Sequence, residues 1–279
     1  MAKDSKIEWT HHTFNPWWGC AKVSPACKYC YAETWAKRIG SHVWGASAPR
    51  RFFTDKHWQD PLRWDAEAAE RGERRRVFCA SMADVFERRK ELNEPRERLW
   101  KLIEETPHLD WLLLTKRPQN IALMAPWGED SPHHVWLVTT VENQTWAEKR
   151  IPILMEVPAR IRFLSCEPLL GPIDLTSFLH QKANGIHWII AGGESGPHSR
   201  PMNPDWVRNL RNQCAENGVA FHFKQWGHWI PEELLTEQQK KITVLDGYRL
   251  AAVGKKQAGR ELDGRTWDEF PSPNLAADG

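Results

Sequence analysis

A short apolar run that ends in polar residues recurs six times along this chain of 279 residues. Stretches of helical character precede or separate several of these runs, for example residues 61–76, which are strongly charged, 146–156 and 204–217. The runs themselves cover residues 77–80, 111–114, 135–138, 161–164, 188–191 and 220–223. Near-continuous apolar strands spaced by helices are typical of a parallel sheet that is buried on both faces.

A further strand is expected in residues 7–17, which brings the pattern to seven units. It predicts an α/β fold, a partial or complete (β/α) barrel of about six to eight parallel strands. A doubly wound open sheet is the alternative, but no glycine-rich dinucleotide fingerprint supports it.

The C-terminal part of the chain has a different pattern. Residues 242–250 predict a small β-hairpin appendage with an Asp-Gly turn. We therefore expect the barrel to occupy residues 1–230, with an insert near residues 40–76. Residues 231–279 are expected to form a C-terminal extension that packs on the barrel.

Three cysteines, Cys20, Cys27 and Cys30, lie within eleven residues on a loop that contains Gly, Ser and Pro. A helix is expected to open after the loop, near Tyr31. Three thiolates suit a four-iron four-sulfur cluster in which each Cys caps one iron and the fourth iron stays open. A structural zinc ion would require four ligands. The spacing therefore predicts an iron–sulfur centre on this loop.

The other cysteines are single and scattered. Cys79 and Cys214 are expected to be reduced thiols that pack in the core. Cys166 lies next to Glu167 at an expected strand end. For Cys166, a reactive thiol or a fourth cluster ligand is an alternative to core packing.

Charged side chains follow several of the expected strands. In a (β/α) barrel the active site gathers at the carboxyl ends of the strands, so we expect these side chains to surround the cysteine loop. Part of the polar content there is explained by helix capping. The strand-end charges are Glu142, Glu167, Glu194, Lys116, Arg117 and Lys224.

The segment Cys27-Lys28-Tyr29-Cys30 resembles the second half of the Cys-x3-Cys-x-aromatic-Cys motif of radical S-adenosylmethionine (SAM) enzymes. The first gap is longer, with six residues between Cys20 and Cys27. More closely, the chain resembles a phage and mobile-element family of radical-SAM-like proteins with a three-cysteine motif. The resemblance extends over residues 14–33, 139–144, 165–170, 192–201, 223–227 and 253–271.

The resemblance implies SAM as the ligand of the open iron and an external electron donor such as flavodoxin or ferredoxin. Gly192-Gly193-Glu194 is similar to the Gly-Gly-Glu that holds the methionyl amino group, although here it follows the sixth strand instead of the second. A glycine-rich turn into a helix is the alternative. Ser81 and Asp84 follow the second strand, where short polar side chains can meet an ammonium or hydroxyl group, although Asp84 can also cap the next element.

These arguments give three groups of candidate residues. Candidates for contacts to SAM are Tyr29, Ser81, Asp84, Glu142, Gly192, Gly193 and Glu194. Candidates for catalysis are Glu167, Lys224 and Cys166. Candidates for substrate binding are Lys116, Arg117, Lys255, Lys256 and Arg260.

The substrate is the least constrained part of the prediction. The net charge of +2 argues neither for nor against a polyanionic partner. A Trp-rich insert, residues 44–64, carries Arg50, Arg51, Lys56 and Arg63, and aromatic faces with nearby cations suit nucleic acid. We therefore expect radical chemistry on nucleic acid, either base modification or lesion repair, as in the loosely similar spore photoproduct lyases. A small nucleotide or amino acid substrate and a non-catalytic, metal-stabilised binding protein are the alternatives.

Residues 1–30 lack the apolar core of a signal peptide, and no apolar run approaches the length of a membrane span. A cytoplasmic location is therefore expected.

Overall fold

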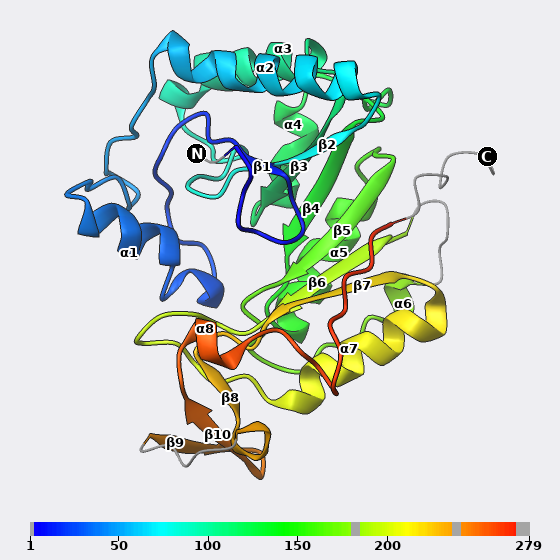
Figure 1. Cartoon of the computed structure of the whole chain (residues 1–279). Coiled ribbons are helices and arrows are strands. Elements are labelled where there is room, and N and C mark those ends of the chain that lie inside the picture. The colour runs from blue at the N-terminus through cyan, green and yellow to red at the C-terminus, as the bar shows by residue number, and fades with distance from the viewer. Residues whose placement is uncertain (1–2, 180–184, 236–240, 272–279) are drawn as a thin grey trace. The chain divides into compact units, whose positions relative to one another are not determined.

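The computed structural model describes residues 3–179, 185–235 and 241–271 (Figure 1). Its main sheet has seven parallel strands, paired in chain order from β1 to β7. The strands are β1 (His12–Thr13), β2 (Arg75–Cys79), β3 (Leu109–Thr115), β4 (Val135–Thr140), β5 (Ile161–Cys166), β6 (Trp188–Gly192) and β7 (Ala220–Gln225). Chain order is what successive βα units produce. No pairing between β1 and β7 closes the sheet within the described ranges, so the expected α/β partial barrel is confirmed.

Eight α-helices and four 3-10 helices connect or follow the strands in the described part of the chain. The α-helices are α1 (Tyr31–Arg38), α2 (Asp55–Arg71), α3 (Asn93–Glu104), α4 (Ile121–Met124), α5 (Gln144–Met155), α6 (Thr176–Leu179), α7 (Pro204–Asn217) and α8 (Lys255–Ala258). The 3-10 helices are η1 (Pro25–Cys27), η2 (Lys90–Leu92), η3 (Pro118–Asn120) and η4 (Glu232–Leu234).

Helix α7 shows why its limits were predictable. The side chain of Asn203 accepts a hydrogen bond from the amide of Asp205 at 2.8 Å and caps the first turn. Pro204 occupies the first helical position, and Gly218 ends the helix with a φ of 66°. A polar N-cap, a proline at the start and a left-handed glycine at the end are all strong sequence signals.

Helix α2 differs from its prediction. The sequence favoured a helix over residues 61–76, because a proline often begins a helix. The helix instead begins at Asp55, contains Pro61, and ends at Gly72, whose φ is 63°. Its buried face is Trp58, Pro61, Trp64 and Ala68, a helical spacing that continues through the proline.

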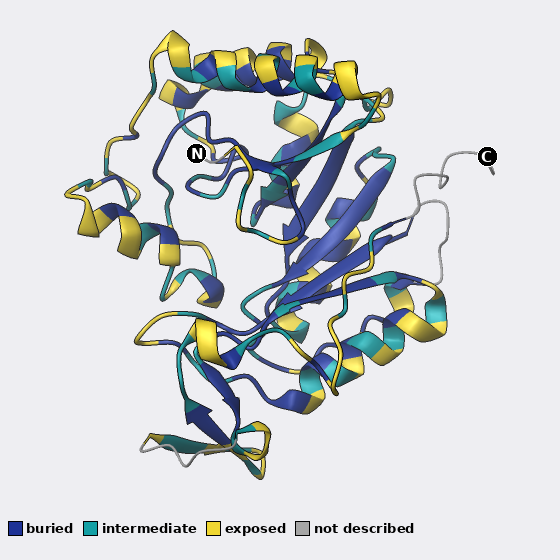
Figure 2. Cartoon of the chain, in the orientation of Figure 1, coloured by how far each residue is buried: buried dark blue, intermediate teal, exposed yellow. Residues whose placement is uncertain are grey.

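The core of the protein is built on the strands. All residues of β4, β5 and β6 are buried, as expected of strands covered on both faces (Figure 2). Trp111, Phe163 and Trp188 are among the largest side chains with almost no exposed surface. The helices present buried and exposed faces in turn, so they cover the sheet with their apolar sides.

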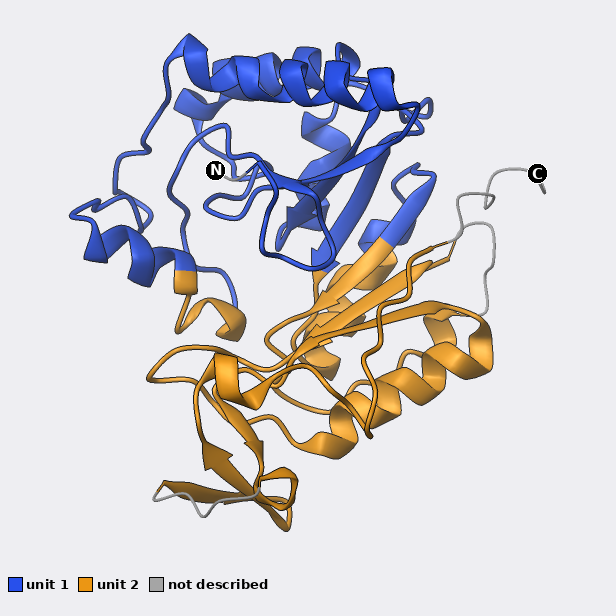
Figure 3. Cartoon of the chain, viewed as in Figure 1, with its two compact units in different colours: residues 1–24, 32–139, 153–162 blue, residues 25–31, 140–152, 163–279 orange. Residues whose placement is uncertain are grey.

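The chain divides into two compact units (Figure 3). The first unit contains residues 1–24, 32–139 and 153–162. The second contains residues 25–31, 140–152 and 163–279. The expected boundary between residues 230 and 231 stays a prediction.

A smaller antiparallel sheet belongs to the second unit. Its order is β8 (Trp229–Pro231), β10 (Tyr248–Ala252) and β9 (Ile242–Leu245). The hairpin turn between β9 and β10 is Asp246 and Gly247, with φ values of 48° and 86°. Two successive positive φ values match the right-handed twist of a hairpin, and the predicted hairpin is confirmed.

None of the helices that the structure describes combines the length and the apolar character required to cross a bilayer.

Replacement of Leu113 by Ala tests the assignment of the core. Leu113 lies in β3 with no exposed surface, between Cys79 of β2 and Leu137 of β4. Leu113→Ala should lower the free energy of unfolding by about 2–5 kcal/mol, because a buried cavity is left behind. Urea unfolding followed by circular dichroism measures this loss. The same change at Leu123, which is 77% exposed, should cost less than about 0.5 kcal/mol. Equal losses in the two variants would contradict the assignment.

Candidate functional site

The six cysteines fall into two classes of exposure. Cys20, Cys27 and Cys30 are partly exposed, whereas Cys79, Cys166 and Cys214 are buried, and none of the six forms a disulfide. Burial raises the pKa of each of the three buried thiols, which keeps them neutral at ordinary pH. The core positions expected for Cys79 and Cys214 are confirmed. The partly exposed thiols are the three that the sequence proposed as metal ligands.

In the first unit, Cys20 is held close to the end of β2. The amide of Gly19 donates to the carbonyl of Met82 at 2.9 Å. Gly19 has a φ of 116°, and a Cβ atom there would lie 2.3 Å from the carbonyl oxygen of Val43. Only glycine fits this approach. The backbone therefore places the Cys20 side chain beside the polar residues that follow β2 and β3.

A buried arginine approaches the Cys20 thiol. Arg117, which follows β3, has Nη1 at 3.7 Å from Cys20 Sγ and at 2.7 Å from Asp84 Oδ2. Its Nη2 donates to the carbonyl of Ala21 at 2.8 Å. Burial raises the pKa of Cys20 to about 12, with a further rise from Asp84 and an opposing effect of Arg117. The guanidinium therefore lies beside a sulfur atom, which differs from the substrate contact expected for Arg117.

Asp84 is the centre of this arrangement. Beyond Arg117, its carboxylate accepts hydrogen bonds from the hydroxyl of Thr115 at 2.8 Å, the amide of Lys116 at 3.1 Å and the amide of Phe86 at 3.1 Å. The contact to Phe86 is the local capping interaction that the sequence left open as an alternative. Asp84 thus links the ends of β2 and β3, and its oxygen atoms are occupied by the protein. The Lys116 side chain is half-buried.

Ser81 also packs within the protein. Its hydroxyl accepts a hydrogen bond from Asn15 Nδ2 at 3.0 Å, and Asn15 Oδ1 accepts one from the amide of Met82 at 2.6 Å. Asn15 precedes the cysteine loop, and Ser81 follows β2. This pair therefore fastens the loop to the strand, a role that the sequence did not predict for either residue.

In the second unit, Glu142 anchors the segment that carries Cys27. Its Oε1 accepts a hydrogen bond from the amide of Ala26 at 3.2 Å, and its Oε2 accepts one from Arg150 Nη1 at 2.9 Å. Glu142 has no exposed surface. The Glu142 carboxylate thus fixes the backbone of the cysteine segment at Ala26. The sequence had suggested that Glu142 contacts SAM.

A second anchor comes from Arg200, which the sequence did not single out. Arg200 forms an ion pair with Glu194, and its Nε and backbone amide lie 2.9 and 2.8 Å from Glu194 Oε2. Its Nη2 also donates to the carbonyl of Pro25 at 3.1 Å, and its guanidinium lies 5.3 Å from the ring centre of Tyr29. Glu194 therefore holds Arg200 against the cysteine segment. The signal available in the sequence was a cation six residues after a strand-end carboxylate.

Gly192 and Gly193 serve the packing of the ends of β6 and β7. A Cβ atom at Gly193 would lie 1.9 Å from the carbonyl oxygen of Trp226. The amide of Gly193 donates to the carbonyl of Gln225 at 2.9 Å. At Gly192, a Cβ atom would lie 3.2 Å from that same carbonyl oxygen. The geometry therefore gives these glycines a packing role, a close approach of the ends of β6 and β7, whereas the alternative that the sequence offered was a glycine-rich turn into a helix.

Glu167 and Lys224 form a pair with partial access to solvent. Lys224 Nζ lies 2.6 Å from Glu167 Oε2, and Gln225 Nε2 donates to Glu167 Oε1 at 3.0 Å. The two charged side chains are 18% and 14% exposed, respectively. A carboxylate with an adjacent ammonium group can exchange a proton with a bound molecule. The thiol of Cys166, next to Glu167 in the chain, has no exposed surface.

The basic residues that the sequence proposed for substrate binding differ in their exposure to solvent. Lys255 and Lys256 are exposed on α8, while Arg260 is partly buried and pairs with Asp268. Arg50 forms a buried ion pair with Glu87, and its side chain has no exposed surface. Arg50 therefore cannot contact a nucleic-acid backbone, and that part of the sequence prediction is wrong.

The three loop thiols are the donor set that the sequence predicts for a metal cluster. Cys20 belongs to the first unit, and Cys27 and Cys30 belong to the second. Within the described ranges, no three His, Cys, Asp or Glu side chains form a metal-binding group. The chemistry of the donors nevertheless fits a cluster, because three reduced, partly exposed thiols lie on one short stretch of chain.

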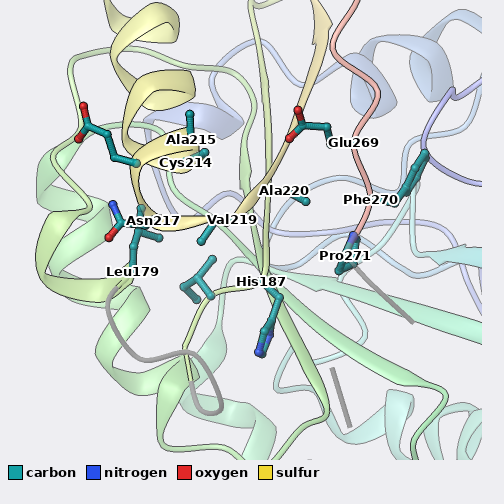
Figure 4. Close-up of a pocket in the computed structure, with 13 residues that line it drawn as sticks. Leu179, His187, Cys214, Ala215, Asn217, Val219, Ala220, Glu269, Phe270 and Pro271 are labelled. Carbon is teal, nitrogen blue, oxygen red and sulfur yellow. The ribbon is translucent and has the colours of Figure 1, made fainter. Parts of the chain in front are cut away.

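A cavity of about 880 Å³ lies elsewhere in the second unit (Figure 4). His187 and Ala220, at the amino-terminal ends of β6 and β7, line it together with Glu269 and Phe270. The candidate residues follow the carboxyl ends of these strands, so this cavity is at the opposite end of β6 and β7 from them.

Comparisons with known proteins give a family. The model of the family described as "Protein of unknown function (DUF5131)" matches residues 4–271, and the chain belongs to this family. No curated protein matches the sequence.

Among solved structures, the chain is similar to spore photoproduct lyases. A cysteine-to-serine variant is 12% identical, with a TM-score of 0.47 over 91% of this chain and 72% of that one. A doubly substituted variant with bound AdoMet and dinucleoside spore photoproduct is also 12% identical, with a TM-score of 0.44 over 87% of this chain and 68% of that one.

Replacement of Asp84 by Asn tests its role as an anchor. Asp84→Asn removes the nearer of the two carboxylates beside the buried guanidinium of Arg117 and leaves only Glu87, at 4.0 Å, which should cost about 3–5 kcal/mol of unfolding free energy. Asp55→Asn is the matched control, because Asp55 pairs with Arg98 in solvent. That change should cost less than about 1 kcal/mol. Urea unfolding measures both losses, and an Asp84 variant as stable as the control would contradict the role.

Proposed function

We propose that Cys20, Cys27 and Cys30 hold an iron–sulfur cluster and that the protein is a radical SAM-type enzyme. One observation carries the proposal: among the six cysteines, the three with the expected ligand spacing are also the three with solvent access. When bound and reduced, such a cluster would supply the single electron that breaks the 5'-carbon–sulfur bond of SAM and releases methionine, so that the 5'-deoxyadenosyl radical could take a hydrogen atom from a substrate. The protein supplies binding, orientation and exclusion of water.

In this proposal Arg117 adjusts the electrostatics of the cluster. A guanidinium beside a thiolate ligand offsets part of the negative charge, and hydrogen bonds to ligand sulfur raise the reduction potential. Asp84 fixes the orientation of Arg117 through the contacts described above. We therefore assign Arg117 and Asp84 to the support of Cys20 and no longer to substrate or SAM.

Glu142 and Glu194 take a similar supporting role for Cys27 and Cys30. Through the Ala26 amide and through Arg200, they hold the segment on which both thiols lie. A fixed ligand segment lowers the cost of ordering the site when the cluster binds. Tyr29, on the same segment, remains the proposed contact to SAM.

The pair of Glu167 and Lys224 is the proposed acid–base group. Glu167 directly follows β5, and Lys224 lies in β7. Both side chains are partly exposed, and proton exchange with a bound substrate requires such access to solvent. Cys166 is given no catalytic role here, because its side chain has no exposed surface.

Nucleic acid is the proposed substrate class, with base modification or lesion repair as the outcome. Exposed aromatic and basic side chains of the first unit, among them Trp35 and Arg51, support it. Radical chemistry on a small nucleotide or amino acid is the second candidate, because the net charge of +2 gives no general affinity for polyanions.

Anaerobic reconstitution tests the metal centre. We expect about four iron and four sulfide ions per chain in the wild type. Cys20→Ala, Cys27→Ala and Cys30→Ala should each lose most of both, because each removes one thiolate ligand. Cys214→Ala is the matched control and should retain the cluster, because Cys214 is a core residue of α7. Absence of iron and sulfide in the wild type would refute the proposal, and full occupancy by zinc would favour a non-catalytic binding protein.

The position of Arg117 predicts a redox effect. Arg117→Met removes a cation beside a cluster ligand and so disfavours the more negative reduced state. The midpoint potential should fall by about 60 mV or more, since loss of a charge-assisted hydrogen bond of about 1.4 kcal/mol corresponds to that shift for one electron. Redox titration monitored by EPR measures it. Arg98→Met, an exposed arginine on α3, should leave the potential unchanged; an unchanged potential in the Arg117 variant would count against the contact.

A further inference from the structure

We propose that an exposed surface of the first unit binds unpaired bases of single-stranded nucleic acid. This aromatic–basic surface consists of Trp35 and Ile39 of α1 and its continuation, Arg51 and Phe53 of the following segment, and Trp18 beneath them. The choice of nucleic acid rests on the proposed function, whereas the location and the preference for unpaired bases come from the surface itself.

Trp18 connects the aromatic members of the surface. Its ring packs edge-on against Trp35, with ring centres 5.0 Å apart, and against Phe53 at 5.4 Å. Trp18 itself is nearly buried, but Trp35 is 42% exposed. Ile39, one helical turn after Trp35, is also exposed. The inner indole thus supports outer apolar side chains whose surfaces face solvent.

Arg51 adds a cation to the same aromatic group. Its guanidinium lies 4.6 Å from the ring centre of Trp18 and 5.7 Å from that of Phe53. No carboxylate pairs with Arg51 among the residues that the structure describes. A guanidinium stacked on an indole keeps its hydrogen-bond donors available, and such donors match phosphate oxygens.

The local charge is complementary to a polyanion. Residues 33–60 contain five basic residues and three acidic residues, in a chain whose net charge is only +2. Arg50 is turned inward, and Lys37 pairs with Glu33. The other basic residues, Arg38, Arg51 and Lys56, are exposed. The remaining acids are paired as well, Asp55 with Arg98 and Asp60 with Arg63. Exposed cations therefore lie around the exposed rings.

The surface is ordered in advance by the buried Arg50. Its guanidinium donates to the carbonyls of Val43 at 3.1 Å and Ala48 at 2.8 Å while it pairs with Glu87. The backbone of Arg51 forms two hydrogen bonds of 2.9 Å with that of Trp18. A platform that is already rigid loses little entropy when a ligand binds.

The same segment is connected to the cysteine loop. The amide of Gly45 donates to the carbonyl of Cys20 at 3.0 Å, and Trp18 lies two residues before Cys20. A base stacked on this surface would therefore be bound by the part of the chain that positions the first cluster ligand. This connection makes the surface a specific candidate for substrate binding.

The aromatic component favours single strands over duplexes. Base faces are available for stacking only when the bases are unpaired, whereas phosphates are available in both forms. A surface that acted through charge alone would bind duplex at least as well, since duplex has the higher charge density. The exposed rings therefore predict selectivity for a single strand.

Fluorescence anisotropy with a labelled oligothymidylate, compared with a duplex of equal length at low salt, tests the proposal. We expect tighter binding of the single strand. Trp35→Ala should weaken this binding roughly 5- to 100-fold, as expected for the loss of one stacking contact. Trp35→Phe keeps a ring and should retain most of the affinity. Leu123→Ala, which removes an exposed apolar side chain on α4, is the control and should bind like the wild type.

The basic residues have their own measurement. Arg51→Ala and Lys56→Ala should each reduce the slope of log affinity against log salt by about 0.7, the value for one lost phosphate contact on a single strand. Lys101→Ala, an exposed lysine of α3, should leave the slope unchanged.

The outcomes separate this inference from the proposed function. Loss of single-strand binding in Trp35→Ala, with iron and sulfide content like the wild type, supports the surface. Wild-type protein that lacks a cluster but retains the selective binding would refute the proposed enzyme and leave the surface in place. The inference is overturned by equal affinity of wild type and Trp35→Ala, by equal binding of duplex, or by binding to anionic lipid vesicles in place of oligonucleotide.

Discussion

A carboxylate buried at the end of a β-strand has to be paired, because an unpaired charge there loses its hydration without compensation. This constraint organises the polar residues of both units. The pairs are Asp84 with Arg117, Glu142 with Arg150, and Glu194 with Arg200. In each pair one residue also bonds to the backbone of the cysteine loop. Arg117 bonds to Ala21, Glu142 to Ala26, and Arg200 to Pro25. The charges at the strand ends therefore support the loop, and the loop carries the proposed chemistry.

The pairing also explains how far sequence reasoning could reach. The strands and helix α7 were predictable, because apolar runs, caps and glycines are local signals. The roles of the strand-end carboxylates were not, because each depends on a partner that only the fold brings close. Asp84 and Arg117 are separated by 33 residues, and Glu142 reaches back 116 residues to the amide of Ala26. Arg200 was missed as well, because its contact to Pro25 joins residues 175 positions apart in the sequence.

Two of the misinterpretations have a common physical origin. Pro61 was taken as a helix start, although the apolar spacing of α2 continues on both sides of it. Arg50 was assigned to a basic surface, although Glu87 draws it inward. In both cases a local preference was overridden by packing with residues distant in sequence. The misplaced Arg50 is informative, since its inward position is what orders the surface formed by Trp18, Trp35 and Arg51.

The central claim is that the three loop thiols leave one iron of a cluster open for SAM. EPR spectroscopy of the anaerobically reconstituted, reduced protein tests this most directly, with spectra recorded before and after SAM is added. We predict a four-iron four-sulfur signal that changes when SAM binds, because SAM would become a ligand of the open iron. A cluster signal that SAM leaves unchanged, or no cluster signal at all, would contradict it.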